Sequence, residues 1–385
     1  MRTGTAIIGG GAIGLSIAWE LAAAGEAVAV IDGRSAVPRA TKAAAGMLAP
    51  SFEGAEPHLL GGAPAALRDF SLASLRAWPG YAEALREASG IDVDYRPEGV
   101  LGVALDEAGA ERLAAQAAAM EAAGVTSERL DAKATREFEP HLSEAVIGGL
   151  FALEEGQVDP ILLVAALEAA ARRAGAEVRQ GVVARLTPEK GALRLTLASG
   201  GLFFADRVVV AAGAGVFAEA AGMPPGVVQP VKGDALALKV ADARGPSRVI
   251  RGAGAYICPK SDGRIVIGAT EVSGHDRLDP DANEVARLRA RAERIAPLLA
   301  RAHEASRWAG LRPGTPDAAP VIGPLSGRDE RIIFAVGHYR NGVLLAPATA
   351  RMVAERLLGG TGDWPAAFSP DRFLERSMTP DRKLR

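Results

Sequence analysis

Three glycines, Gly9, Gly11 and Gly14, interrupt an apolar segment at the start of the chain. Residues 5–8 before them predict a short buried strand, and residues 12–24 after them carry apolar side chains at helical spacing. In such a strand–turn–helix unit the first glycine permits the tight turn and the second lets a pyrophosphate approach the backbone. The third lets helix and strand pack closely, with the phosphates at the helix N-terminus. The chain is therefore expected to begin with a nucleotide-binding βαβ unit.

An acidic residue follows at the distance that this motif requires. Asp32 ends the second apolar strand, residues 27–31, and stands 18 positions beyond Gly14. A carboxylate at that point accepts hydrogen bonds from a ribose hydroxyl. The strand, the helix and the acid together predict a dinucleotide with a free adenosine 2′-hydroxyl, which is FAD or NAD.

Two further segments of small residues bear on this cofactor. A partial repeat of the motif, Gly213-x-Gly215-x-x-Ala218, follows an apolar strand, with Asp234 beyond it. It leaves a second nucleotide site open, although we favour the interpretation that these glycines pass close to the first cofactor. Residues 40–48, ATKAAAGML, either let the backbone approach a flat ring or form the first turn of an alanine-rich helix.

Patterns typical of α/β structure at both ends of the chain enclose a β-rich middle. Helices are expected over residues 64–89, with a break at Pro79, and over residues 341–358. Between residues 227 and 270 the segments ALALKV and GRIVIG alternate along the strand, as in an antiparallel sheet with one exposed face. One domain is therefore expected to be interrupted by another.

Composition excludes several classes of function. The chain has 44 Lys and Arg against 46 Asp and Glu, and aromatic residues make up only 5%, so no nucleic acid and no membrane is expected as a partner. The single cysteine, Cys258, rules out internal disulfides and cysteine-ligated clusters, suits a reducing cytoplasm, and is expected to be a packed thiol. The five histidines show no metal-ligand spacing. We expect a soluble, cytoplasmic protein with no metal.

Two arginines near the C-terminus predict an anionic substrate. Arg312 lies in WAGLRPGTPDAAPVIG and Arg340 in GHYRNGVLLAP. The guanidinium fork suits a carboxylate, and we expect Arg340 to be the main anchor because its segment runs from a strand into a helix start. Backbone N–H groups at such a start can stabilise negative charge on a reduced flavin. Tyr256, in GAYICPK, either reaches the same carboxylate or packs as a structural strand tyrosine.

These segments resemble the glycine oxidase, or thiamine-biosynthesis, branch of the D-amino acid oxidase family of FAD flavoproteins. The match rests on AIIGGGAIG, TKAAAGML, GAYICPK with GRIVIGAT, WAGLRPGTPDAAPVIG and GHYRNGVLLAPAT, in this order over nearly the whole chain. The resemblance implies an α/β fold, a glutathione-reductase-like FAD-binding Rossmann domain interrupted by an antiparallel-sheet substrate domain. The expected ranges are 1–82, 144–222 and 309–365 for the FAD-binding domain, 83–143 and 223–308 for the substrate-binding domain, and 366–385 for a C-terminal tail.

The resemblance also implies the residues of the site. Its positions for the substrate carboxylate are Tyr256, Arg312 and Arg340. The positions expected to bind FAD, motif glycines included, are Gly9, Gly11, Ala12, Ile13, Gly14, Asp32, Gly33, Ala40, Thr41, Ala45, Gly46, Met47, Val183, Gly213, His338, Tyr339, Arg340, Asn341, Gly342, Val343 and Leu344. No side chain is expected to act as acid or base, because hydride transfer to the flavin requires none.

The chemistry implied by the resemblance is oxidation of a small amino acid, such as glycine, sarcosine or a small D-amino acid, at Cα. FAD is expected to be noncovalent, because the C-terminal motif has no cysteine. Oxygen would be reduced to hydrogen peroxide, and the imine would give glyoxylate and ammonia or pass to thiazole synthesis. The family suggests a homotetramer. The alternatives are a D-amino acid or sarcosine dehydrogenase with a non-oxygen acceptor, and a flavin-binding protein without turnover.

Two positions depart from the family pattern. Glu271 follows GRIVIGAT where an apolar, substrate-facing residue also occurs, and Gly254 stands two residues before Tyr256 where a larger polar residue can occur. Glu271 is either a carboxylate at the rim of the pocket, which would favour small primary amines, or a solvated residue at a strand end.

Overall fold

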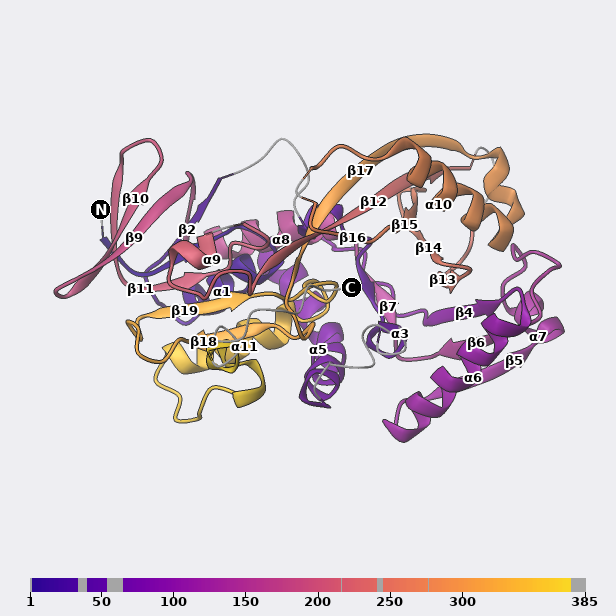
Figure 1. The fold of residues 1–385 in the computed structure, drawn as a ribbon, viewed down its shortest axis with the longest axis horizontal. Coiled ribbons are helices and arrows are strands. Elements are labelled where there is room, and N and C mark those ends of the chain that lie inside the picture. The colour runs from indigo at the N-terminus through magenta and orange to yellow at the C-terminus, as the bar shows by residue number, and fades with distance from the viewer. Residues whose placement is uncertain are drawn as a thin grey trace.

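The chain folds around two sheets that lie side by side (Figure 1). The computed structural model describes residues 2–33, 40–53, 65–215, 217–240, 245–275 and 277–374. An eight-stranded sheet has the order β18-β19-β11-β1-β2-β8, with β10 and β9 continuing from β11. A nine-stranded sheet has the order β16-β12-β15-β14-β13-β4-β6-β5, with β17 paired to β12.

The first sheet has a parallel centre with both faces buried. Strands β8, β2, β1, β11 and β19 run parallel. Along β1, Ile7 belongs to the core on one face and Ile8 to the core on the other, as the period-2 geometry of a strand requires. The strands of this sheet are β1 (Arg2–Ile8), β2 (Val28–Asp32), β8 (Glu177–Gln180), β9 (Val183–Glu189), β10 (Ala192–Leu197), β11 (Leu202–Val210), β18 (Val321–Pro324) and β19 (Ile332–Val336).

Helices cover one face of this sheet, and a hairpin with a short helix covers the other. The helices are α1 (Ala12–Ala23), α5 (Ala65–Ser89), α8 (Pro160–Arg173) and α11 (Ala346–Leu357). The hairpin β9–β10 and α9 (Phe217–Ala220) contribute to the core on the opposite face. The sequence prediction of a Rossmann-type α/β fold is confirmed by this arrangement.

The second sheet is antiparallel except where β13 pairs with β4. Helix α10 (Ala282–Ile295) and η1 (Pro297–Arg301) pack on one face, and α6 (Glu107–Ala122) contributes Met120 to the core on the other. The strands are β4 (Val100–Ala104), β5 (Ser127–Asp131), β6 (Gly148–Ala152), β12 (Gln229–Lys239), β13 (Val249–Gly252), β14 (Ala255–Pro259), β15 (Ile265–Gly268), β16 (Val272–Ser273) and β17 (His303–Gly314).

Short elements connect the two sheets and close the chain. A two-stranded sheet joins β3 and β7. No helix among the described residues is long and apolar enough to span a bilayer. The short elements are α2 (Ala40–Ala43), β3 (Met47–Leu48), α3 (Pro50–Glu53), α7 (Ala132–Phe138), β7 (Gly156–Gln157), η2 (Ala366–Phe368) and η3 (Pro370–Phe373).

The expected helix break at Pro79 is wrong. Helix α5 continues through Pro79, although proline lacks the N–H that would bond to the Leu75 carbonyl. Trp78 and Leu85 are both fully buried on this helix, and the Trp78 indole donates to the Leu344 carbonyl at 3.0 Å. Tertiary packing of the apolar face therefore outweighs the local cost of the proline.

Three further expectations concern where segments begin and end. Helix α11 begins at Ala346 rather than at residue 341, because hydrogen-bonded turns occupy the preceding residues. Strand β6, placed within the range 144–222, pairs in the nine-stranded sheet, so we propose that the domain boundary follows it. The expected tail is packed up to Leu374, with Phe368 and Phe373 buried, and its remainder lies outside the described residues.

Candidate active site

A cleft of about 690 Å³ opens between the two sheets. On the side of the first sheet, the cleft is lined by the N-terminus of α1, the end of β2, and the residues after β11 and β19. Residues 40–47, together with parts of β12, β14 and β17, form the rest of the lining. This volume lies within the range of cofactor and small-molecule sites, which are typically about 300–1,000 Å³.

The glycine turn before α1 leaves no room for side chains. Gly9 has φ +113°, and a Cβ on it would lie 2.3 Å from the Ala211 carbonyl oxygen. A Cβ on Gly14 would lie 2.0 Å from the Gly9 carbonyl oxygen, so this glycine brings helix and strand together. The Ala12 N–H donates to Thr41 Oγ1 at 3.1 Å. Gly11 and Ala12 line the cleft here, so a phosphate group can approach the backbone at the start of α1.

Asp32 lies where the sequence analysis placed it, at the end of β2 in the cleft. A Cβ on Gly10 would lie only 3.0 Å from the Asp32 Cβ, so the bare turn passes directly beside this acid. The partial repeat does not form a separate site. Gly213 and Gly215 line the same cleft, whereas the Asp234 carboxylate is buried on β12 and pairs with a lysine at 3.2 Å.

Residues 40–48 include a short helical turn beside the cleft, and the approach of their backbone to a flat ring stays a prediction. Residues 40–43 form the single turn of α2, and Gly46, with φ +80°, redirects the chain into β3. All of residues 40–47 line the cleft. The backbone is close-packed at Gly46, because a Cβ there would lie 2.0 Å from the Val158 carbonyl oxygen. This segment forms one wall of the cleft, and we call residues 45–47 the flavin wall because the sequence predicts flavin contacts there.

Arg312 reaches the cleft from β17, and its charge has no acidic partner among the described residues. Its Nη1 donates to the Thr270 carbonyl at 3.1 Å and lies 3.4 Å from the Lys232 carbonyl. Gly233 makes room for the guanidinium, because a Cβ there would lie 2.4 Å from Nη1. Backbone carbonyls therefore orient this guanidinium and leave its formal charge available to an anion.

Arg340 lies in the same cleft but shares its charge with Glu271. Arg340 Nη1 is 3.5 Å from Glu271 Oε2, and the Tyr339 hydroxyl donates to the other oxygen of this carboxylate. Burial and the adjacent Glu271 carboxylate raise the pKa of Tyr339, so its hydroxyl stays protonated and continues to donate. Glu271 is exposed but contacts two of the expected site residues, so its role at the rim of the cleft stays a prediction.

Tyr256 and Cys258 share one face of β14, as the strand period requires. Tyr256 lines the cleft, and its ring lies over Gly268, where a Cβ would come within 2.3 Å of the hydroxyl oxygen. Cys258 is fully buried, and burial raises the pKa of its thiol to about 11. This burial confirms the expectation of a packed thiol. A neutral, inaccessible sulfur is not a nucleophile.

His338 stands at the start of the segment after β19 and is buried. Burial lowers the pKa of its imidazole to about 3, so the ring is neutral at physiological pH. Its Nε2 lies 3.1 Å from Thr349 Oγ1 on α11. His338 is thereby held as a neutral, fixed part of the cleft wall.

Most of the expected site residues meet in this one cleft. Tyr256, Arg312 and Arg340 all line it. The expected FAD positions that line it are Gly9, Gly11, Ala12, Ile13, Asp32, Ala40, Thr41, Ala45, Gly46, Met47, Gly213, His338, Tyr339, Arg340, Asn341, Gly342 and Val343. Those outside its lining are Gly14, Gly33, Val183 and Leu344.

Each outlying residue has another observed place in the structure, and Gly33 directly follows β2. Gly14 acts at the helix–strand contact, Val183 is buried beneath the first sheet, and the Leu344 carbonyl accepts from Ser74 and Trp78. Lining residues such as Ala269, Leu278 and Gly310 were not predicted from the sequence. Ala269 and Gly310 lie within GRIVIGAT and WAGLRPGTPDAAPVIG, but their side chains carry no chemical signal, and Leu278 lies outside the motifs.

The cleft fits a flavin dinucleotide in the chemistry of its lining. The bare glycine turn and helix N-terminus lie near Asp32, while the flavin wall, Tyr256 and two arginines line other parts of the same volume. One elongated ligand can thus place a pyrophosphate on α1 and a ring system near the arginines. No group of three or more His, Cys, Asp or Glu residues in the described ranges could hold a metal ion.

Comparisons with known proteins agree with this architecture. The model of a family described as FAD dependent oxidoreductase (DAO) matches residues 5–356. Glycine oxidase of Bacillus licheniformis is 35% identical over 376 residues, which cover 96% of this chain and 98% of that protein. The crystal structure of glycine oxidase from Geobacillus kaustophilus has a TM-score of 0.89 and 32% identity, covering 96% of this chain and 99% of that one.

A bifunctional relative is longer than this chain. The bifunctional protein ThiO/ThiG of Synechocystis sp. is 35% identical over 381 residues, which are 97% of this chain but 54% of that protein. The chain therefore spans about half the length of this relative.

Proposed function

Because the chain belongs to the DAO family of FAD-dependent oxidoreductases, we propose that it oxidises glycine and similarly small amino acids at Cα. The observation that carries the proposal is the meeting of Arg312, Arg340 and Tyr256 in the FAD cleft. The names of the glycine oxidase relatives, which align over nearly the full chain, support the same substrate class.

In this proposal Arg312 is the main anchor of the substrate carboxylate. Its guanidinium is oriented by backbone carbonyls and has no acidic partner among the described residues, whereas Arg340 already lies 3.5 Å from Glu271. This proposal replaces the expectation that Arg340 is the main anchor of the substrate carboxylate. Arg340 and Tyr256 then complete the carboxylate site, and the three side chains fix which face of Cα is presented.

The chemistry divides between the cofactor and the chain. FAD, when bound, supplies the acceptor for the hydride that leaves Cα. The chain's own residues bind and orient the substrate, and the small, apolar wall residues exclude water from the reacting bond. His338 is buried, its Nε2 lies against Thr349 Oγ1, and its lowered pKa makes it a weak base, so it is a poor proton acceptor for the substrate. The substrate amine must be unprotonated when the hydride leaves, because its lone pair drives that departure.

We extend the proposal to the partners of the reaction. Oxygen would accept the electrons and form hydrogen peroxide, and water would convert the imine to glyoxylate and ammonia. The bifunctional ThiO/ThiG relatives favour a route in which the imine passes to thiazole synthesis. A homotetrameric assembly and a cytoplasmic location, in which Cys258 stays reduced, belong to the same proposal.

A peroxide assay tests the proposed function. The purified, FAD-loaded protein is supplied with glycine, sarcosine or D-alanine, and peroxide and ammonia are measured together. We expect equimolar peroxide and ammonia from glycine. Flavin reduction by these amino acids without peroxide would instead assign a dehydrogenase. No flavin reduction by any of them under anaerobic conditions would overturn the substrate class.

A further inference from the structure

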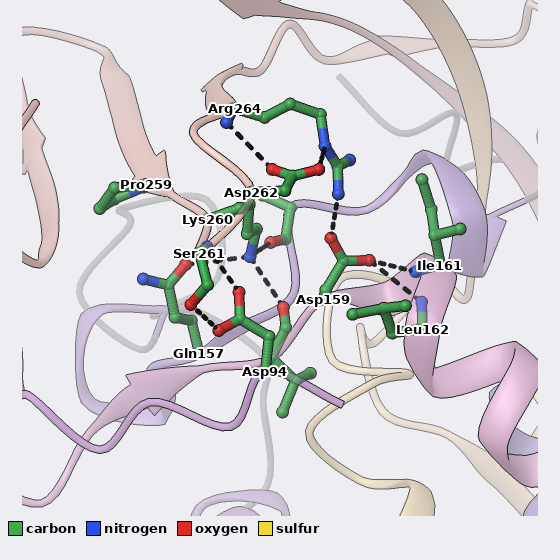
Figure 2. Close-up of polar contacts among 12 residues, drawn as sticks. Asp94, Gln157, Asp159, Ile161, Leu162, Pro259, Lys260, Ser261, Asp262 and Arg264 are labelled. Atoms are coloured by element: carbon green, nitrogen blue, oxygen red, sulfur yellow. Dashed lines mark hydrogen bonds and ion pairs between the residues drawn. The ribbon is translucent and has the colours of Figure 1, made fainter. Parts of the chain in front are cut away.

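Lys260 is a buried lysine directly after β14, the strand that carries Tyr256. It is 5% exposed, and its Nζ makes three hydrogen bonds (Figure 2). Nζ donates to the Ala45 carbonyl at 2.7 Å, to the Val158 carbonyl at 2.8 Å and to Gln157 Oε1 at 2.9 Å. The lysine thus joins the end of β14 to two segments, one at Ala45 and one at residues 157–158.

The three contacts match an ammonium group. Each accepting oxygen needs one N–H, and only the protonated amine carries three. None of these acceptors is a carboxylate. Burial lowers the pKa of Lys260, while the negative charges of Asp159 and Asp94 oppose this shift. Both carboxylates are otherwise engaged, Asp159 with Arg264 and Asp94 with Ser261 (Figure 2).

Lys260 binds one backbone oxygen of the flavin wall itself, that of Ala45, and two oxygens of the segment beside it, those of Gln157 and Val158. Ala45 begins that wall, and the Gly46 carbonyl accepts from the Val158 N–H at 2.9 Å. Met47 pairs with Gln157 in the β3–β7 ladder. Lys260 therefore contacts both sides of this small ladder, yet it does not itself line the cleft.

We propose that Lys260 is a positioning residue, which fixes the flavin wall at the distance from Tyr256 that FAD requires. The residue acts through Ala45 on one side and through strand β14 on the other. The inference rests on the proposed function for the identity of the substrate. The effect of Lys260 on FAD binding does not depend on which amino acid is oxidised.

Arg264 offers a matched control at the same junction. It lies four residues further along the same turn, and its guanidinium pairs with the Asp159 carboxylate. The other oxygen of Asp159 accepts from the Ile161 and Leu162 N–H groups, so the start of α8 keeps its cap without Arg264. Arg264→Met removes a contact between the same two parts of the molecule without touching Ala45.

The experiment compares Lys260→Met, Lys260→Gln and Arg264→Met in the full chain. Each apoprotein is titrated with FAD by flavin fluorescence, and the visible spectrum and thermal midpoint of each holoprotein are recorded. We expect Lys260→Met to raise the FAD Kd at least tenfold and to alter the flavin absorption bands. Lys260→Gln keeps two N–H donors, so its FAD Kd should lie between those of Lys260→Met and the parent protein. Arg264→Met should lower the thermal midpoint and change the FAD Kd less than twofold.

Two results would overturn the proposal. The first is an unchanged FAD Kd and spectrum in Lys260→Met, whatever its thermal midpoint. The second is an equal change in Kd in Arg264→Met, which would make Lys260 one of several general contacts between the sheets. If Lys260→Met does not fold, the comparison of Lys260→Gln with Arg264→Met decides by the same criteria. Normal FAD binding without glycine oxidation would count against the proposed function alone.

Discussion

The Glu271 carboxylate lies 3.5 Å from the Arg340 guanidinium and accepts a hydrogen bond from Tyr339. A substrate carboxylate that binds Arg340 must therefore share this cation with a carboxylate of the protein itself. The side chains of Arg340 and Glu271 are 16% and 31% exposed, so solvent screens the pair in part. Glu271 is consequently expected to weaken binding of simple anions more than binding of zwitterions, whose ammonium group it attracts.

Replacing Glu271 with Gln tests this competition. The variant keeps a hydrogen-bond acceptor for Tyr339 and removes the charge. We expect the inhibition constant of glycolate, an anion without an ammonium group, to fall about two- to fivefold, because a partly exposed ion pair is worth up to about 1 kcal/mol. The KM for glycine should change less. Equal shifts for glycolate and glycine would contradict a role in charge selection.

Replacing Glu271 with Met tests selection among amines. Loss of the carboxylate removes an attraction to the small primary ammonium and leaves an apolar surface for an N-methyl group. The ratio of kcat/KM for sarcosine over glycine should rise a few-fold, which corresponds to about 1 kcal/mol. A flat ratio, with both activities normal, would show that Glu271 does not face the amine.

The two arginines should differ in their contributions. Arg312→Ala removes a charge-assisted contact that no acid of the described chain shares, and such a contact is worth about 1.5–3 kcal/mol. We expect kcat/KM for glycine to fall roughly 10- to 100-fold with FAD retained. Arg340→Ala should lower kcat/KM for glycine less, because Glu271 already offsets part of the charge of Arg340. A larger loss in Arg340→Ala than in Arg312→Ala would reverse the assignment of the main anchor.

The buried His338 should make stability depend on pH. Its pKa is about 3 in the folded chain and about 6.5 in an unfolded one, so the unfolded chain binds the additional proton between these values. Stability is unaffected above pH 6.5 and falls as the pH decreases towards 3, by at most about 1.4 kcal/mol per pH unit. Urea unfolding at pH 7, 6 and 5 should show a shallower decline in His338→Gln than in the parent. Parallel declines would contradict the neutral, buried imidazole.

The FAD should be released without breaking a covalent bond. The C-terminal segment contains no cysteine, and Cys258 is fully buried on β14. Acid precipitation should therefore leave yellow FAD in the supernatant. Flavin that stays with the protein pellet would disprove the noncovalent attachment.

The sequence predicted the parts of the site that local chemistry specifies. The turn before α1 requires glycine at positions 9 and 14, and an acidic residue at the end of the second strand is typical of ribose binding. Both lie in one short segment, which is therefore enough to predict the nucleotide site. Arg312 and Arg340 could be paired because a guanidinium fork within a Gly-rich or Pro-rich segment suits a carboxylate.

Contacts between distant segments could not be predicted in the same way. Lys260 follows a buried strand, as many solvated lysines do, and nothing near it in sequence indicates the Ala45 and Val158 carbonyls that it binds. The pairing of Glu271 with Arg340 likewise depends on how two sheets meet. The helix break predicted at Pro79 fails for the same reason, because packing of the buried face of α5 outweighs the local effect of the proline.

Gly14 and Gly80 offer a final test of what the glycine turn contributes, because both are helical glycines with opposite surroundings. A Cβ on Gly14 would meet the Gly9 carbonyl oxygen at 2.0 Å, whereas a Cβ on the exposed Gly80 would meet nothing within 4 Å. In Gly14→Ala the helix must move away from β1, which typically costs about 1–3 kcal/mol in packing. The N–H groups at the start of α1 then move with it. We expect a lower thermal midpoint and an FAD Kd raised about tenfold or more. Gly80→Ala should leave the FAD Kd unchanged and stabilise α5 by about 0.5–1 kcal/mol, because alanine is the better helix former. An unchanged FAD Kd in Gly14→Ala would show that close contact between α1 and β1 is not needed for cofactor binding.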